Sequence, residues 1–256
     1  MELRKNLFLA GEHLKIRKEK LWLVAADAVD GARFHIIHPK KQREIWRLSP
    51  GEYGIVALAL LKLEAIHGSV KYTELDFSSL CKLLAFVDAA RQHNIVTARI
   101  RNWVYHTLSS EEIRHYDAEK VDVLFLNYFL ENQDKNNDIV SFFRSSENYW
   151  LIRFLLEESK NNILLKDISI KYGLSPSHFR RLTRQALGKN TKCELKNWRV
   201  IRALLASIGT EKKPRLTDIA IEHGYASLSH FSGEVKSLFG VSPKDLKNSI
   251  INDAKK

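Results

Sequence analysis

A degenerate repeat in the last third of the chain constrains the fold more than any other feature. The stretch Leu165–Gly173 is echoed 51 residues later by Leu216–Gly224. The tripeptide Ser-His-Phe at residues 177–179 returns at residues 229–231, offset by 52 residues, so the second turn is one residue longer. Two helices joined by a tight turn that contains Gly have the form of a helix-turn-helix. The repeat therefore predicts two such motifs.

The two predicted motifs cover about residues 165–188 and 216–240, and the stretch between them predicts a long connecting helix. Thr191 is placed to cap this helix, which would run to about Ser207 and bury one side. A basic loop with Lys212 and Lys213 follows; these are read as solvated or phosphate-contacting side chains. The buried side of the connecting helix is expected to contain Leu195, Trp198, Ile201 and Leu205.

Positive charge is concentrated in the half of the chain that carries the repeat. Residues 139–256 hold 21 Lys or Arg and 11 Asp or Glu side chains, a net charge of +10. Residues 1–138 hold 20 and 19, a net charge of +1. Solubility alone gives no reason for charge to collect in one half, whereas binding a polyanion does. The repeat and the charge together indicate a nucleic-acid-binding domain.

A run of eight polar residues, 131–138, cannot bury a face and predicts a boundary between two domains, 1–138 and 139–256. Before it, the apolar stretches Lys20–Ala26 and Phe34–His38 predict strands, and Asp30-Gly31 predicts a turn between them. From about Asp76 the spacing of apolar residues becomes helical. We therefore expect a mainly α chain, in which an all-α C-terminal domain follows a smaller α+β N-terminal domain.

The first motif offers a second helix that suits base reading. Ser175 is expected to cap this helix, with Pro176 at its first position, where a missing N–H loses no hydrogen bond. Apolar residues from Phe179 to Leu187 fall on one stripe. An Arg side chain can bind a guanine edge through two hydrogen bonds, worth about 1–3 kcal/mol of discrimination. The residues expected to face DNA are Ser177, Arg180, Arg181 and Arg184.

The second motif offers a less charged face. Ser227 is the expected cap, and Phe231, Val235, Leu238 and Phe239 form the expected inward stripe. Small polar groups and one cation favour phosphate contact over base reading. The residues expected to face DNA are Ser229, Ser232 and Lys236, with Gly233 between them.

These residues resemble the DNA-binding domain of the AraC/XylS family of bacterial transcriptional regulators over roughly residues 147–250. The resemblance rests on Ser175–Gly188, on Trp198-Arg199 with Ala203–Leu205, and above all on the stretch from Ile219-Ala220 to Ser242-Pro243. Ser79–Phe86 and Asn148-Tyr149-Trp150 look most similar to the invasion-gene activators of type III secretion systems, the InvF and MxiE group.

The resemblance implies an activator of virulence and type III secretion genes. Such a protein would bind double-stranded promoter DNA as a monomer or weak homodimer, contact RNA polymerase, and require a secretion chaperone of the tetratricopeptide class as coactivator. In many family members a basic residue stands where this chain has Gly233. The N-terminal half shows no clear version of the sugar-binding cupin of the family's namesake, yet control by a small ligand remains the alternative.

Other classes of function find little support in the sequence. His178 and His230 are read as packing or phosphate-facing groups and not as metal ligands, because no ligand stands at zinc-site spacing. His35, His38 and Asp30 are read as surface loop residues, and Cys193 as unreactive. A DNA-repair methyltransferase with a similar domain would need a cysteine cluster, which Cys81 does not provide. We expect no enzyme, cofactor or metal.

The compartment follows from two further observations. Two cysteines make no disulfide framework and fit a reducing cytoplasm. The longest apolar run, Ile55–Leu61, falls far short of the roughly 20 residues that a membrane span needs.

Overall fold

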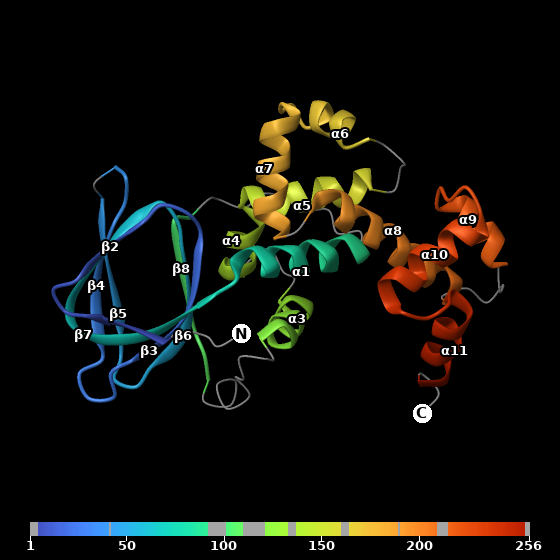
Figure 1. The fold of residues 1–256 in the computed structure, drawn as a ribbon. Coiled ribbons are helices and arrows are strands. Elements are labelled where there is room, and N and C mark those ends of the chain that lie inside the picture. The colour runs from blue at the N-terminus through green and yellow to red at the C-terminus, as the bar shows by residue number, and fades with distance from the viewer. Residues whose placement is uncertain are drawn as a thin grey trace. The chain divides into compact units, whose positions relative to one another are not determined.

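The computed structural model divides into two compact units, Met1–Trp150 and Leu151–Lys256 (Figure 1). We call them the N-terminal and C-terminal units and describe each by itself. The predicted domain border after residue 138 stays a prediction. The structure describes residues 5–40, 42–91, 101–109, 121–132, 137–159, 164–188, 190–208 and 215–253.

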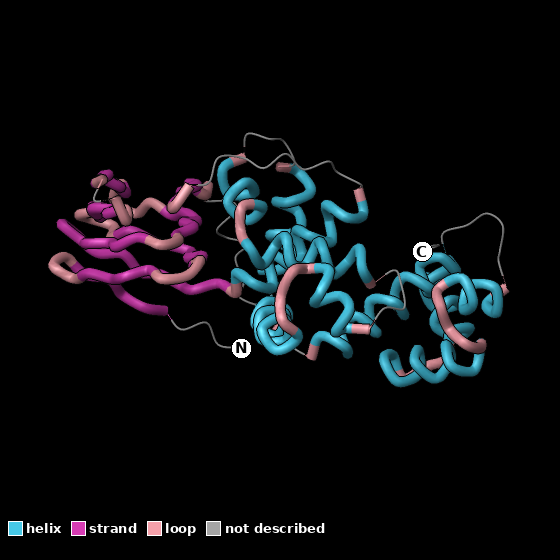
Figure 2. The backbone as a smooth tube through the Cα atoms, turned by 90° about the horizontal axis from the view of Figure 1, so that it is seen from above, coloured by secondary structure: helices cyan, strands magenta, loops and turns pink. Residues whose placement is uncertain are grey.

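An antiparallel sheet of eight strands makes up most of the N-terminal unit, and every strand of the described chain lies there (Figure 2). Its main path runs β5-β4-β7-β3-β6-β8, and β1 and β2 also pair with β7. The strands are β1 (Lys5–Leu9), β2 (His13–Ile16), β3 (Lys20–Ala26), β4 (Ala32–Ile37), β5 (Arg43–Leu48), β6 (Tyr53–Leu58), β7 (Leu61–Leu75) and β8 (Trp103–Thr107).

The expectation of a mainly α chain with a smaller α+β N-terminal domain is wrong, because the sheet dominates the larger unit. The missed element is β7, which pairs with four other strands. Its first half alternates buried Leu61, Leu63 and Ala65 with partly exposed Lys62 and Glu64, the period of two that a half-buried strand requires. Because Lys62 and Glu64 interrupt the apolar residues, a search for continuous apolar runs does not find this strand.

The turn predicted at Asp30-Gly31 is present, but the strands on either side of it are not hairpin partners. Gly31 has a φ of +64°, and a Cβ there would lie 2.4 Å from the carbonyl oxygen of Leu48, so only glycine fits. The Asp27 carboxylate accepts hydrogen bonds from the backbone N–H groups of Asp30 and Val29, which lower its pKa. β3 and β4 then pair with different halves of β7.

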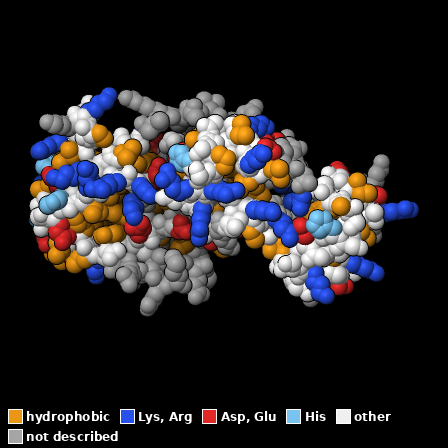
Figure 3. Space-filling view, turned by 45° about the horizontal axis from the view of Figure 1, so that its top comes forward, with side chains coloured by type: hydrophobic (Ala, Val, Ile, Leu, Met, Phe, Trp, Pro, Cys, Tyr) orange, Lys and Arg blue, Asp and Glu red, His pale blue; other side chains and the backbone are white. Residues whose placement is uncertain are grey.

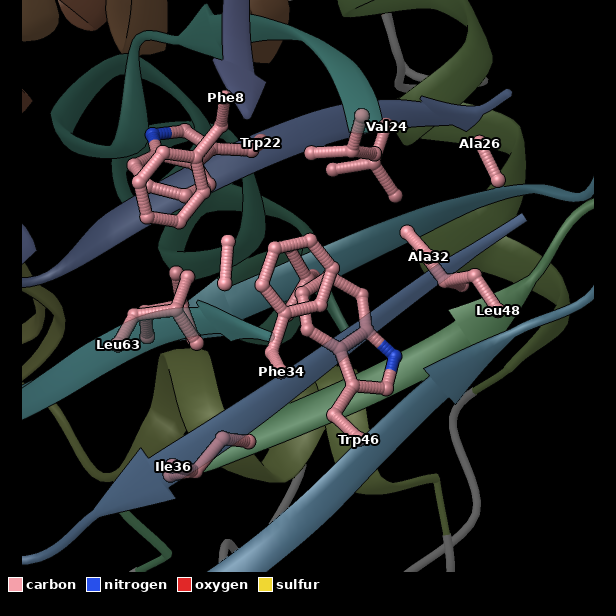
Figure 4. Packing of buried hydrophobic residues seen from close by; sticks show 14 of the residues in the cluster. Phe8, Trp22, Val24, Ala26, Ala32, Phe34, Ile36, Trp46, Leu48 and Leu63 are labelled. Carbon is pink, nitrogen blue, oxygen red and sulfur yellow. The ribbon is translucent and has the colours of Figure 1, made fainter. Parts of the chain in front are cut away.

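The sheet folds around an aromatic core (Figure 4). The ring of Phe34, fully buried on β4, stacks on Trp46 of β5 at 4.9 Å and on Phe8 of β1 at 5.7 Å between centroids. Trp22 of β3 lies 4.3 Å from the ring of Tyr72. Aromatic side chains bury a large area each, so this core supplies much of the stability of the unit.

Helices complete the N-terminal unit: α1 (Phe77–Ala90), α3 (Val121–Glu131), α4 (Asp138–Arg144) and the start of α5 (Glu147–Glu158). The carboxylate of Asp76 caps α1, confirming the helix predicted there. Arg144 of α4 makes a bidentate ion pair with buried Asp88 of α1, with N···O distances of 2.8 and 3.0 Å. The hydroxyl of Tyr149 donates to the same carboxylate at 2.6 Å, so Asp88 ties three helices together.

The C-terminal unit is all helical, as predicted. After the rest of α5 it contains α6 (Leu165–Lys171), α7 (Pro176–Leu187), α8 (Thr191–Ile208), α9 (Leu216–Glu222), α10 (Leu228–Phe239) and α11 (Pro243–Asp253). A core cluster joins Val200, Ala203 and Leu204 of α8 to Ile219 of α9 and Phe231 of α10. The helix α11 was not predicted.

Candidate nucleic-acid interface

The first helix-turn-helix consists of α6, a glycine turn and α7. Gly173 has a φ of +84°, and the N–H of Leu174 donates to the carbonyl of Ser169 at 3.0 Å, which closes the turn. The hydroxyl of Ser175 accepts from the N–H of His178 at 3.4 Å, and Pro176 occupies the first turn. The predicted cap and proline position are therefore confirmed, and they fix where α7 begins.

One side of α7 is buried and the other is exposed. Phe179 is fully buried, and the hydroxyl of Thr183 bonds that of Thr191 on α8 at 2.6 Å, which ties the two helices together. The sequence did not mark this threonine pair. All four residues predicted to face DNA are exposed: Ser177, Arg180, Arg181 and Arg184.

The three arginines of α7 have no carboxylate partner in the described part of the chain. Among the described residues, none of Arg180, Arg181 and Arg184 forms an ion pair with an Asp or Glu side chain. Figure 3 shows Lys and Arg side chains in blue on the described surface that is turned toward the viewer. Like charges on one exposed helix repel one another until a polyanion neutralises them, so α7 offers an anion-binding face.

The second motif repeats this frame on α9 and α10. The hydroxyl of Ser227 accepts from the N–H of His230 at 3.1 Å, which confirms the predicted cap. Phe231 and Val235 are fully buried. Of the residues predicted to face DNA, Ser229 and Lys236 are exposed and Ser232 is half-buried. Gly233 is exposed, and nothing lies within 4 Å of a Cβ built on it, so α10 has room for a side chain there.

Beside this face lies a buried acid that sequence reasoning missed. Glu234 of α10 is only 7% exposed, and its Oε1 lies 3.1 Å from His230 Nε2, 3.4 Å from Lys196 Nζ and 3.5 Å from Arg199 Nη2. The Arg199 guanidinium also stands over the ring of Tyr225, 4.6 Å from its centroid. Burial raises the pKa of Tyr225 to about 12, so the ring stays neutral.

The Glu234 network anchors α10 to α8. The sequence contains the acid three residues after the inward Phe231, and Lys196 and Arg199 three residues apart on α8, but their spacing does not indicate that the two helices meet there. The second motif presents less positive charge than the first, because α10 has Lys236 where α7 has three arginines.

The two motifs share one cleft, of about 710 Å³. Arg180 of α7 lines it together with His230 of α10, and α8 lies between them. The cleft is rich in cations, with Glu234 as its one acid. Its basic lining is Lys166, Arg180, Lys192, Lys196, Arg199 and His230.

Some details of the predicted packing are wrong. Ile201 is 38% and Leu205 62% exposed, because α8 turns Val200, Ala203 and Leu204 into the core instead. Phe239, at the end of α10, is 42% exposed. Thr191 is the first residue of α8; the side chain of Asn190 accepts from the N–H of Lys192 at 3.0 Å and does the capping. Lys212 and Lys213 lie outside the described residues.

The other chemically notable side chains have ordinary surroundings. His178 is exposed, and Cys193 is exposed. His35 lies within β4 and not in a loop, and His38 Nε2 lies 2.9 Å from Glu44 Oε1. Burial raises the pKa of the Cys81 thiol, which keeps it protonated. Within the described ranges, no three His, Cys, Asp or Glu side chains are grouped to hold a metal ion.

Comparison with known proteins places this geometry in a family. Residues 168–249, which contain α7 and α10, match the helix-turn-helix domain family. The chain is 38% identical to the invasion protein InvF of Salmonella typhimurium over 187 residues, 72% of this chain and 84% of InvF. It is 33% identical to the transcriptional regulator MxiE of Shigella flexneri over 179 residues, 68% of this chain and 83% of MxiE. The chain belongs to the AraC/XylS family, in the group of InvF and MxiE.

The solved structures that resemble the chain have lower sequence identity. ToxT of Vibrio cholerae is 14% identical, with a TM-score of 0.40 over 96% of this chain and 98% of ToxT. The C-terminal domain of AraT of Geobacillus stearothermophilus is 24% identical, with a TM-score of 0.37 over 41% of this chain and 88% of that domain. No helix in the described part of the chain is long and apolar enough to cross a bilayer. As a member of this family, the chain is a transcription regulator.

Proposed function

We propose that this AraC-type regulator activates virulence and type III secretion genes by reading promoter DNA mainly with α7. The observation that carries this proposal is the set of three exposed arginines on α7, which pair with no acid among the described residues. Arg180 and Arg181 lie in the first turns of the helix, where recognition helices contact base edges. Ser177 and Arg184 extend the contact to neighbouring phosphates.

The second motif binds the backbone on this proposal. Ser229, Ser232 and Lys236 present two hydroxyls and one cation, which suit phosphate oxygens and carry little base information. The connecting helix α8 has 18 residues and is about 27 Å long. That length suits two heads in successive major grooves on one side of DNA, about 34 Å apart.

Binding to DNA is tested with the full chain and a fluorescent promoter duplex. The account expects saturable binding whose affinity falls steeply as salt rises from low to physiological concentration, because phosphate contacts release counterions. A chain that is folded by circular dichroism and yet binds no promoter duplex at low salt contradicts the proposal.

The proposal includes activation through a protein coactivator, a secretion chaperone of the tetratricopeptide class, and contact with RNA polymerase. The chain acts on this view as a monomer or weak homodimer, without enzymatic chemistry of its own. This part of the proposal is supported by the sequence relationship to two proteins, the invasion protein InvF and the transcriptional regulator MxiE.

Control by a small ligand is the second candidate, and one observation favours it. The N-terminal unit has a cleft of about 600 Å³, lined by Trp103 and Tyr105 with the charged groups Arg101, Glu44 and Asp138. Its polar groups already bond one another: Trp103 Nε1 donates to Glu44 at 2.8 Å, and Arg101 pairs with Asp138 at 2.6 Å. A ligand would therefore have to displace internal bonds, which weighs against this candidate.

A two-plasmid reporter assay separates the two modes of control. The account expects weak activation by the chain alone and strong activation when the cognate chaperone is co-expressed. Full activation without the chaperone contradicts the coactivator requirement, and activation only by a metabolite supports the ligand-controlled alternative.

A further inference from the structure

The outer face of the sheet in the N-terminal unit gathers cations across four strands. On β2, β4, β5 and the first half of β7, side chains alternate between the aromatic core and the outside. These strands are neighbours by register, and their labels lie together in Figure 1. We call the outward side chains of these strands the basic sheet face. Its cations are Lys15, Arg33, Arg43, Arg47 and Lys62, and it also contains Ile45, His35 and Glu64.

Register places like charges directly opposite each other on this face. Lys15 of β2 is the partner of Lys62 of β7, and Arg33 of β4 is the partner of Arg47 of β5. Side chains opposite each other in an antiparallel pair are close neighbours, and like charges there destabilise the sheet. Two such pairs on one face are hard to explain by folding alone.

Little negative charge offsets these cations. Glu64 is the one acid on the face, and it bonds Lys62 at 2.9 Å. That bond, with Arg43 and His35 nearby, lowers the pKa of Glu64. In the described chain, Lys15, Arg33, Arg43 and Arg47 form no ion pair with a carboxylate. Since residues 1–138 have a net charge of only +1, the unit's acids lie elsewhere and the face is a local concentration.

Aliphatic side chains lie among the cations. Ile45 is 51% exposed on β5, directly opposite His35, and Ile66 is 41% exposed at the irregularity between β4 and β7. Protein–protein interfaces combine exposed apolar side chains with Arg, whereas a DNA backbone leaves apolar groups facing phosphates. The mixture therefore favours a protein partner over a nucleic acid.

We propose that the basic sheet face docks an acidic protein surface, one that presents carboxylates around an aliphatic centre. Carboxylates would neutralise the Arg33–Arg47 and Lys15–Lys62 pairs, and the aliphatic centre would cover Ile45. The proposal does not depend on DNA binding by the C-terminal unit, so the two can fail separately.

The first test is stability. Arg47→Glu converts the like-charged pair with Arg33 into an opposite pair, so the full chain should melt about 1–3 °C higher. The double change Arg33→Glu with Arg47→Glu restores repulsion and should return the melting temperature to near the wild-type value. The control Arg17→Glu changes charge equally at an exposed position between β2 and β3. A loss of stability from Arg47→Glu beyond that of the control overturns the proposal, because the cations would then serve the fold.

The second test is binding, with a soluble acidic amphipathic peptide of Glu and Leu as the probe. Wild type should bind it saturably, and the Arg33→Glu, Arg47→Glu double change should weaken binding at least tenfold, whereas Arg17→Glu with Lys18→Glu should not. Promoter duplex and phosphatidylglycerol vesicles are run in parallel. If the double change spares peptide binding, or weakens duplex or vesicle binding as much as peptide binding, the face does not serve a protein partner.

Discussion

The two helix-turn-helix motifs share a frame, which is their caps, turns and buried rings, but they differ in the exposed face of the second helix. Both reading helices have 12 residues, begin after a capping serine and end at a left-handed glycine, Gly188 or Gly240. Phe179 and Phe231 fill equivalent buried sites. The frame needs these residues in both copies, because caps, turns and buried rings set where a helix starts, stops and packs.

The faces differ at equivalent positions two turns into each helix. Where α7 has Arg181 and Leu182, α10 has Gly233 and Glu234. Arg181 is exposed, whereas Glu234 is buried and pairs with Lys196 and Arg199 of α8. The comparison teaches that α7 keeps an exposed basic face, whereas α10 uses a buried acid to hold the connecting helix α8.

The largest effect should test the shared frame. Phe179→Ala and Phe231→Ala each remove a fully buried ring, so each should lower the free energy of unfolding by about 3–5 kcal/mol. Urea denaturation of the two variants measures this, with exposed Phe239→Ala as the control. A loss below about 1 kcal/mol at either buried site would break the equivalence of the two frames.

The next largest effect should show whether the exposed face of α7 contacts DNA bases. Arg181→Ala should weaken promoter binding by about 1–3 kcal/mol and relax preference at one or two base pairs, because a bidentate base contact is lost. Fluorescence anisotropy measures the change, with Gln185→Ala on the same exposed helix as the control. An unchanged affinity would remove Arg181 from the reading face.

Neutralising Glu234 should test whether the buried acid of the second motif holds α10 to α8. Glu234→Gln leaves Lys196, Arg199 and His230 facing one another, so the free energy of unfolding should fall by about 1–2 kcal/mol, less than for a fully buried pair because Lys196 and His230 are about half exposed. Non-specific DNA affinity should rise at low salt. The matched control is exposed Glu222→Gln, and a change no larger than the control's would mean that the network does not hold α10.

A smaller effect is expected when the exposed face of α10 is made more like that of α7. Gly233→Arg places a cation where α7 has Arg181, and nothing lies within 4 Å to obstruct it. Affinity for DNA should increase by about 1 kcal/mol. Gly233→Ala serves as the control, because it raises helix propensity by a similar amount without adding charge. Equal affinities for the Arg and Ala variants would show that α10 stands away from the DNA at this position.

The features that could be predicted are those whose determinants lie within a few residues of one another in the sequence. The caps Ser175 and Ser227, the glycine turns and the stripes around Phe179 and Phe231 are set within a few residues, and the sequence contains them in readable spacing. The strand β7 and the orientation of α8 depend on partners far along the chain. Lys62 and Glu64 interrupt the apolar residues of β7, so the strand does not stand out as an apolar run. Leu205 has the spacing of a buried residue, but tertiary packing leaves it exposed.

The network around Glu234 could not be predicted for a related reason. A glutamate in a helix is ordinarily solvated. His230 lies one turn earlier on α10, and only the approach of α8 adds Lys196 and Arg199 as neighbours. The same holds for the basic sheet face, because its like-charged pairs exist only in the observed register.

The central claim is that α7 reads bases and α10 holds phosphates. It is tested most directly by measuring binding of wild type, Arg181→Ala and Lys236→Ala to a promoter duplex and to a set of its single-base-pair variants, across a range of salt. Arg181→Ala should flatten the preference at one or two positions. Lys236→Ala should weaken binding to every duplex alike and lower the salt slope by about one. Equal, sequence-independent losses from both substitutions would contradict the division of roles.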